Sequence, residues 1–357
     1  MKFRIAALLA LSWLVLASPI HAQLYSVTDL GTLGGTFSVA FSINDSGTIT
    51  GDSQNAGGND IAYSYSGGVM TNLGTLPGGT YSEGRAINAS GTIAGYSDSS
   101  VGERAYSYSG GTWTNLGTLG GFDSDAYGIN SAGTVVGGAL NAGGNAHAFS
   151  YSGGVMTDLG TLGGVNSTAQ GIDSSGTIVG YADNASGNYH AFSYSGGVMT
   201  DLGTLGGALS YASAINDSGT IAGVAKTAGG NMHAFSYSGG VMTDLGTLGG
   251  TYSEASTINA SGTIVGDAYT SGGQDDAFIY SGGVMADLNS LLDSSGAGWT
   301  LTAATGINGS GQIVGYGINP GGQTDAFLLN PVPEPSACAM LVGGLGLFGA
   351  VVCRRRV

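Results

Sequence analysis

The chain alternates short apolar and polar runs with pairs of glycines, and this pattern recurs along most of its length. One copy predicts four short strands, at Ser38–Asn44, Thr48–Ser53, Ile61–Ser66 and Val69–Leu73. A polar turn separates the first two strands, and Gly67-Gly68 supplies the positive φ that a two-residue hairpin needs. Runs this short, bounded by turn residues, are typical of β-strands.

The pattern is an internal repeat of about 43 residues. The leucine of its motif Asp/Asn-Leu-Gly-Thr-Leu recurs at Leu30, Leu73, Leu116, Leu159, Leu202, Leu245 and, in a divergent copy, Leu288. The isoleucine of the Ile-Asn or Ile-Asp pair that ends the first strand recurs at Ile43, Ile87, Ile129, Ile172, Ile215, Ile258 and Ile307. Four strands in a repeat of this size are typical of a β-propeller blade, whereas the coils of a β-helix are usually nearer half this length. We therefore predict an all-β, seven-bladed β-propeller.

The two ends of the repeat region complement each other. The seventh copy stops after its third strand, at Ala326–Asn330, and lacks the usual final hairpin. The segment Leu24–Leu30 precedes the first copy and has the sequence of a fourth strand. We expect this N-terminal strand to complete the seventh blade and to close the ring, which would leave no open sheet edge.

The N-terminus predicts a secretory signal peptide. Lys2 and Arg4 precede the apolar run Ile5–Ala17, which is shorter than the ~20 residues that a spanning helix needs. We expect cleavage between Ala22 and Gln23.

The C-terminus has three parts, in the order of a sorting signal. These are the motif Val332-Pro333-Glu334-Pro335, the apolar stretch Ser336–Cys353, and the cluster Arg354, Arg355 and Arg356. A basic cluster after an apolar span favours a transmembrane helix with its end in the cytoplasm. The tail resembles the PEP-CTERM sorting signal. This resemblance implies that an exosortase recognises and cleaves the tail, that the inner membrane holds the chain transiently, and that the host is a Gram-negative bacterium that exports polysaccharide.

These features divide the chain into a signal peptide (1–22), a propeller (23–330) and a sorting tail (331–357). Composition agrees, because 69 of 357 residues are Gly, without the period of collagen, and a mean hydropathy of +0.19 is too apolar for a disordered chain. Between Gln23 and Pro335 the basic residues are Arg85, Arg104 and Lys226, against all 23 acidic residues, which leaves a net charge of −20. Such a surface repels nucleic acid and anionic lipid, but it is compatible with divalent cations or neutral glycans.

The repeat itself carries a second resemblance. The sequence His-Ala-Phe-Ser-Tyr-Ser-Gly-Gly-Val-Met-Thr-Asp-Leu-Gly-Thr-Leu-Gly-Gly occurs at His147–Gly164, His190–Gly207 and His233–Gly250. It resembles the bacterial extracellular HAF-repeat proteins over about residues 23–330. That resemblance implies no particular activity.

Candidate catalytic chemistry is sparse. The three repeated histidines lie one repeat apart and away from the expected axis, so we expect each to pair with a neighbouring loop rather than to share a metal. No Gly-x-Ser-x-Gly or His-Glu-x-x-His motif occurs, and few cations are present to stabilise a transition state. We predict a protein that is not an enzyme. The alternative is a polysaccharide hydrolase or lyase that uses a carboxylate pair, first among Glu83, Asp123 and Asp125.

Candidate ligand-binding residues lie six positions before the repeated isoleucine, where the copies diverge. With a tryptophan from an insertion in the seventh copy, the candidates are Phe37, Tyr81, Asp123, Asn166, Tyr252 and Trp299; the same position holds Leu209 and Leu301 in the remaining copies. We expect them to ring a channel mouth and stack on sugars, or instead to plug the channel by packing. The acids Glu83, Asp125 and Glu254 offer a weak divalent cation site, such as one for calcium, and no other cofactor is expected.

These observations favour an exported cell-surface or extracellular-matrix scaffold of a biofilm, sorted by exosortase. Its expected partner outside the cell is an exopolysaccharide or another protein.

Overall fold

The computed structural model describes residues 23–333, which form an all-β body, as predicted. Within this range the helical segments are two short 3-10 turns, η1 (Leu288–Leu291) and η2 (Ser294–Gly296). No helix in the described range is long and apolar enough to cross a membrane. The predicted signal peptide and the predicted apolar helix 336–353 lie outside the described residues.

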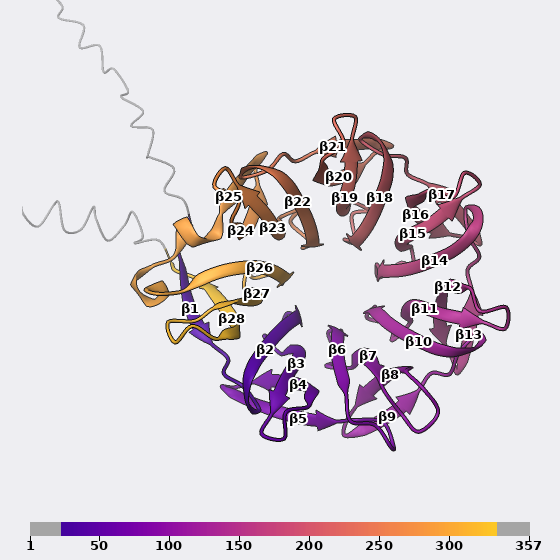
Figure 1. Ribbon diagram of the computed structural model, residues 1–357, viewed down its shortest axis with the longest axis horizontal. Helices are drawn as coiled ribbons and strands as arrows, with labels where there is room; N and C mark the ends of the chain where they lie inside the picture. Colours follow the sequence, from indigo (N-terminus) through magenta and orange to yellow (C-terminus); the bar gives the residue numbers. More distant parts are fainter. Residues whose placement is uncertain (1–22, 334–357) are drawn as a thin grey trace, which may run out of the picture.

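The strands form four-stranded antiparallel units arranged around a central axis (Figure 1). Unit 1 consists of β2 (Gly34–Ile43), β3 (Ile49–Asn55), β4 (Asp60–Ser66) and β5 (Val69–Gly74). Unit 2 consists of β6 (Ser82–Ile87), β7 (Ile93–Ser97), β8 (Arg104–Ser109) and β9 (Thr112–Asn115). Unit 3 consists of β10 (Gly120–Ile129), β11 (Val135–Asn141), β12 (Ala146–Ser152) and β13 (Val155–Asp158). Unit 4 consists of β14 (Gly163–Ile172), β15 (Ile178–Asn184), β16 (Tyr189–Ser195) and β17 (Val198–Asp201).

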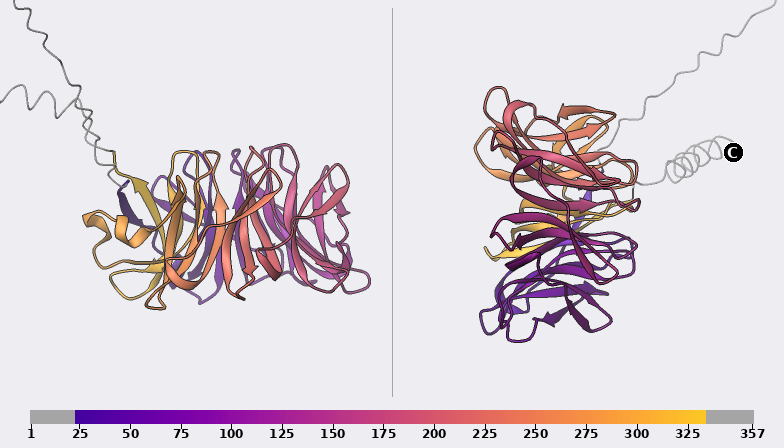
Figure 2. Two further views of the ribbon diagram at one scale, coloured as in Figure 1. Left: turned by 90° about the horizontal axis from the view of Figure 1, so that it is seen from above. Right: turned by 90° about the vertical axis from the view of Figure 1, so that its right-hand side faces the viewer.

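The remaining units follow the same order from the axis outward. Unit 5 consists of β18 (Gly206–Ile215), β19 (Ile221–Thr227), β20 (Met232–Ser238) and β21 (Val241–Asp244). Unit 6 consists of β22 (Gly249–Ile258), β23 (Ile264–Thr270), β24 (Asp275–Ser281) and β25 (Val284–Asp287). Unit 7 consists of β26 (Thr300–Ile307), β27 (Ile313–Ile318), β28 (Thr324–Pro331) and β1 (Tyr25–Asp29). Figure 2 shows that the units stand side by side, so their strands cross the thickness of a flat body.

The four strands predicted for the first repeat are all present, with shifted bounds. The largest shift is in β2, which begins at Gly34 because Gly34 pairs with Asn55 of β3. Each innermost strand then contains a β-bulge before its final isoleucine, which in unit 1 falls between Ala40 and Ser42. On β3, Gly51 faces this bulge, where a Cβ atom would overlap the carbonyl oxygen of Val39.

The N-terminal strand β1 is held on both of its edges. On one edge it pairs antiparallel with β28, from Tyr25 opposite Pro331 to Asp29 opposite Phe327. On the other edge the insertion of the seventh copy covers it: Asp293 donates its N–H to the carbonyl of Tyr25, and Val27 donates to Ser295 Oγ.

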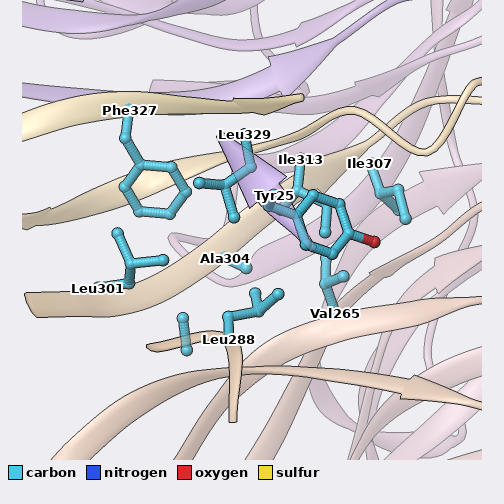
Figure 3. Packing of buried hydrophobic residues seen from close by; sticks show 10 residues of the cluster. Tyr25, Val265, Leu288, Leu301, Ala304, Ile307, Ile313, Phe327 and Leu329 are labelled. Atoms are coloured by element: carbon cyan, nitrogen blue, oxygen red, sulfur yellow. The ribbon is translucent and has the colours of Figure 1, made fainter. Parts of the chain in front are cut away.

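The side chain of Tyr25 belongs to the core between units 6 and 7. It is 4% exposed and packs in a cluster that includes Leu288, Leu301 and Leu329 (Figure 3). The third strand of every unit buries a large aromatic residue in the equivalent place, and these residues are Tyr63, Tyr106, Phe149, Phe192, Phe235, Phe278 and Phe327. Dispersion and hydrophobic burial between neighbouring units therefore supply the core, without a single central core.

Buried asparagines link the turns of neighbouring units. The Nδ2 of Asn44 donates to the carbonyl of Asn88 at 3.0 Å, and the same bond joins Asn88 to Asn130. Along the chain it continues from Asn130 to Asp173, from Asn216 to Asn259, from Asn259 to Asn308, and from Asn308 to Asn44. Asp173 has no amide to donate, and at this turn the neighbouring units are joined by the bond from the backbone N–H of Ser174 to Asp217 Oδ1. The equivalent bond from Gly309 to Asp45 accompanies the amide bond of Asn308. We call these bonds the amide belt.

Loss of β1 should destabilise the body. Deleting residues 24–30 removes the buried side chains of Tyr25 and Leu30, and burial of one large apolar side chain stabilises by roughly 1.5–3 kcal/mol. Because a domain is stable by only ~5–15 kcal/mol, we expect a large fall in melting temperature together with self-association.

A matched pair of single variants refines the test. Tyr25→Ala should cost about 3 kcal/mol, whereas Leu24→Ala, at an exposed position (44%), should cost less than about 0.5 kcal/mol. Equal melting temperatures for the two variants would contradict this role of β1.

Candidate functional site

The β-bulge of each innermost strand turns one side chain toward the axis. The extra residue of the bulge lies two positions before the repeated isoleucine. In order along the chain these residues are Phe41, Arg85, Tyr127, Gln170, Ser213, Ser256 and Thr305. Bulges commonly re-aim a side chain in this way. All seven line one axial cavity of about 510 Å³.

The cavity wall formed by units 1 and 2 carries an internally paired cation. Arg85 forms a salt bridge with Glu83 (Nη2 to Oε2, 2.6 Å) and donates a hydrogen bond to the hydroxyl of Tyr96 at 2.8 Å. Its guanidinium also lies over the ring of Phe41, 4.2 Å from the centroid. Burial raises the pKa of Glu83, although Arg85 opposes this shift. The positive charge of Arg85 is therefore already compensated.

A pair of acidic side chains, Asp125 of unit 3 and Glu103 of unit 2, lies beside this wall. Asp125 accepts a hydrogen bond from the hydroxyl of Tyr127 and also contacts Glu103. Burial and the neighbouring Asp125 carboxylate raise the pKa of Glu103.

The wall formed by unit 6 has carboxylates without a basic partner. Glu254 and Asp267 stand directly opposite each other on β22 and β23, and both line the axial cavity. Asp267 also shares a hydrogen bond with Asp275. Burial, followed by the charges of Asp275 and Glu254, raises the pKa of Asp267 to about 8. The hydroxyl of Tyr252 donates to Glu254 at 2.5 Å.

A smaller pocket of about 320 Å³ adjoins the axial cavity. The two share Gln170, Ser213 and Glu254 in their linings. Tyr181 and Tyr211, whose ring centroids are 5.1 Å apart at 72°, form another part of its wall, together with Tyr252 and Met232. We call this space the tyrosine pocket. Aromatic rings beside a carboxylate and an amide can pack on an organic ring and bond its polar substituents.

The residues predicted to ring the channel mouth lie mostly between units. Phe37 pairs with Thr324 of β28, and Tyr252 pairs in the same way with Met232 of β20. Asp123 accepts the N–H of Glu103, and Asn166 accepts the N–H of Ala146. In each case the partner lies at or just before the start of the third strand of the preceding unit, so this position links neighbours. Leu301 is fully buried in the core.

Two other predicted residues have distinct surroundings. Tyr81 donates its hydroxyl to Glu83, and its ring centroid lies 6.2 Å from that of Tyr96. Trp299 packs edge-on against Phe327 at 6.4 Å, as part of the core around β1. Of the predicted binding residues, Tyr252 lines a cavity.

Each of the three acids considered as a cation ligand already contacts another side chain of the protein. Glu83 pairs with Arg85, Asp125 with Tyr127, and Glu254 with Tyr252. Within residues 23–333 no group of three or more His, Cys, Asp or Glu side chains is arranged to hold a metal ion.

The repeated histidines pair within their own units, not with a neighbouring loop as expected. His147 Nδ1 lies 2.8 Å from the carboxylate of Asp158, at the end of the adjacent strand β13. His190 with Asp201 and His233 with Asp244 repeat this contact. The register of β12 with β13 explains the difference, because Asp158 lies opposite Phe149, two residues after His147.

Sequence reasoning missed Arg85, Tyr127, Gln170 and Asp267. The first three occupy the bulge position. The signal that could have found them is that the residue type at this position changes from repeat to repeat, although the repeats are otherwise similar. Asp267 lies on a second strand, where the equivalent residues include Tyr96, Tyr181 and Tyr316.

Comparison with known proteins identifies the tail and the type of fold. Residues 331–356 match the PEP-CTERM protein-sorting motif, which confirms the prediction for this segment. The chain is therefore an exported, membrane-sorted protein, and the motif implies processing by exosortase. No curated protein matches the chain.

Solved structures resemble the body at low sequence identity. A puromycin-hydrolysing peptidase of Mycobacterium tuberculosis has a TM-score of 0.56 and 11% identity, over 88% of this chain and 57% of that one. YCF48 bound to D1 peptide has a TM-score of 0.51 and 10% identity, over 88% and 97%.

A third match is a fungal lectin from Aleuria aurantia, described as a six-bladed β-propeller. It has a TM-score of 0.38 and 14% identity, over 72% of this chain and 96% of that one. A TM-score this low does not bear on the ligand of this chain. The chain spans less than two thirds of the length of two of these proteins. It covers 57% of the peptidase and 65% of TolB from Acinetobacter baumannii. The likeness supports a β-propeller-like fold and nothing about activity.

The raised pKa of Asp267 predicts a pH dependence of stability. The folded chain keeps a proton on Asp267 up to about pH 8, whereas the unfolded chain releases it near the ordinary value of 3.8. Stability therefore falls as pH rises through this window. Asp267→Asn removes the effect, so its melting temperature should increasingly exceed that of the native protein from pH 4 to pH 8. Asp217→Asn is the control and should follow the native curve, because Asp217 is an exposed turn residue that does not line the cavity, and asparagine keeps the oxygen that accepts the Ser174 N–H. Parallel curves for native protein and Asp267→Asn would refute the predicted dependence.

Proposed function

We propose that the body is a seven-bladed β-propeller of HAF-type repeats, closed by β1. Support comes from three features: the seven copies of the sequence motif, the pairing of β1 with β28, and the amide belt that returns from Asn308 to Asn44. A closed ring presents its variable bulge residues to a shared cavity. It thereby offers a rigid site outside the cell.

We propose further that this protein is a non-enzymatic glycan-binding scaffold of the cell surface or extracellular matrix. The observation that carries this proposal is the tyrosine pocket beside the axial cavity. Its aromatic walls suit the apolar faces of sugar rings, while Gln170 and Glu254 can bond hydroxyl groups. The sorting signal brings such a site to the compartment where exported polysaccharide is found.

Catalysis is the second candidate, and one observation favours it. Asp267, with its raised pKa, and Asp275 resemble an acid that could protonate a leaving oxygen. We favour binding because the acidic residues that line the axial cavity are Glu254 and Asp267, and these two lie directly opposite each other on one sheet instead of on facing walls of the cavity. Incubation with the host polysaccharide should therefore release no new reducing ends, and release that Asp267→Asn abolishes would establish the hydrolase instead.

Binding and packing residues should separate in one experiment. Tyr252→Ala should lower retention of the full-length protein on host exopolysaccharide at least about tenfold, the effect of losing roughly 1.4 kcal/mol of stacking. Trp299→Ala should instead lower stability by about 3 kcal/mol and leave retention unchanged, because Trp299 packs against the core. Tyr81→Ala reports on the opposite wall, where Arg85 is internally paired, and should retain binding. If all three variants bind as the native protein does, glycan binding in the tyrosine pocket is wrong.

The sorting tail makes a second prediction. In a host with exosortase, Arg354, Arg355 and Arg356 should be absent from the mature protein, and in a host without it the chain should stay in the inner membrane. Mass spectrometry of the exported protein measures this directly. A variant with Pro333 and Pro335 changed to Ala is the control and should keep its C-terminus. An intact C-terminus on native protein released by an exosortase-positive host would contradict the assignment.

A further inference from the structure

Units 2 and 6 provide a comparison within one molecule. Both contain the sequence Thr-Tyr-Ser-Glu near the start of their innermost strand, at 80–83 and at 251–254. In both, the tyrosine hydroxyl donates to the glutamate two residues later, as Tyr81 does to Glu83 and Tyr252 to Glu254. The two glutamates thus occupy equivalent positions and accept equivalent hydrogen bonds. Their further surroundings differ.

In unit 2 the protein supplies its own cation. The bulge residue Arg85 pairs with Glu83, and the residue opposite Glu83 on β7 is the neutral Tyr96. The site therefore already holds a planar organic cation, which lies against the rings of Phe41 and Tyr96. This arrangement demonstrates that a cation fits beside a glutamate at this position of the fold.

In unit 6 the same position has no cation. The bulge residue is the small Ser256, and the residue opposite Glu254 is Asp267, a second carboxylate. The charge of Glu254 disfavours ionisation of Asp267, as expected for two carboxyl groups directly opposite each other on a sheet. Asp275 adds a third carboxyl group, and its Oδ1 is buried without a hydrogen-bond partner among the described residues.

Space for a ligand is present where unit 2 has its arginine. Glu254 lines both the axial cavity and the tyrosine pocket, and Ser256 lines the axial cavity. The tyrosine pocket has a volume of about 320 Å³, and neither Lys nor Arg is among its lining residues. This volume is far larger than a metal ion requires, and it has tyrosine side chains where a metal site would have further ligands.

We propose that this space binds a cationic amino sugar. Its ammonium group would lie beside Glu254, as the guanidinium of Arg85 lies beside Glu83, and its pyranose ring would pack on Tyr181, Tyr211 and Tyr252. Tyrosine rings attract cations as well as sugar faces, so one ligand satisfies both parts of the pocket. A neutral sugar would fill the pocket but leave the carboxylates uncompensated. The inference rests on the proposed glycan binding and names the class of glycan.

A matched pair of ligands tests the charge alone. The probes are the β-1,4-linked glucosamine tetramer and its fully N-acetylated form, titrated calorimetrically into the full-length protein in detergent at pH 6. The amino form should bind at least about tenfold more tightly, which is the worth of one charge-assisted hydrogen bond. Glu254→Gln should reduce this preference to less than about twofold. Asp217→Asn removes an equal charge outside the cavity lining and should keep the preference, which excludes a general effect of net charge.

A second variant copies the unit 2 arrangement into unit 6. Ser256→Arg places a guanidinium beside Glu254, so the amino tetramer should lose its advantage while the protein keeps its melting temperature. This variant does not depend on removing a buried group, and therefore it separates loss of binding from loss of folding.

The outcomes distinguish the inference from the function on which it rests. Equal binding of both tetramers overturns the inference and leaves glycan binding intact. Binding of neither tetramer, with retention on host exopolysaccharide still dependent on Tyr252, also overturns the inference alone. Binding of neither tetramer and no retention overturns both. A preference for the amino form that Ser256→Arg and Glu254→Gln both abolish supports the proposal.

Discussion

The structure depends on one side chain that acts in two places, the asparagine that follows the innermost strand of every unit except unit 4. In unit 1 the Oδ1 of Asn44 accepts the backbone N–H groups of Ser46 and Thr48, which fixes the turn. The Nδ2 of the same residue donates to Asn88 of the next unit. Asn44 is only 6% exposed, so breaking either bond would leave a buried polar group without a partner. Local turn geometry and the placement of the neighbouring unit are therefore coupled through one amide.

This coupling explains why the repeats can vary at the axis without loss of the fold. The amide belt holds the units together at their turns, and the buried aromatics hold them by packing between neighbouring units, while the bulge residue belongs to neither set. Position 85 can therefore be an arginine, 127 a tyrosine and 256 a serine within the same backbone. Asp173 illustrates the limit of this tolerance. There the amide is lost, and a bond from the backbone N–H of Ser174 to Asp217 still joins the two turns.

The sequence was sufficient to predict the strands because their turns are encoded locally, by glycine pairs and by the Asn-x-Ser-Gly motif. It was less informative about the cavity, for a physical reason. A bulge inserts one residue into the alternation of a strand, and nothing in the sequence of β2 distinguishes Phe41 from a regular strand residue. Counting back from Ile43 therefore led to Phe37, which contacts β28 instead of the axis. The partner of His147 was missed similarly, because the pairing depends on the register of two strands.

Charge connects the stability of the body to its candidate site. Asp52 and Asp267 both have raised pKa values, about 7 and about 8, chiefly because they are buried, and each lies near further carboxyl groups. Neutral carboxyls at neutral pH cost the folded state part of its stability, since the unfolded chain would ionise them. Near Asp52 this cost is partly offset by Arg85, whose charge lowers the pKa of Asp52. Near Asp267 no basic residue contributes such an effect, and the opposing charges are all negative. The uncompensated wall of the cavity is thus the place where binding of an external cation would recover the most free energy, and it is also the wall that adjoins the tyrosine pocket.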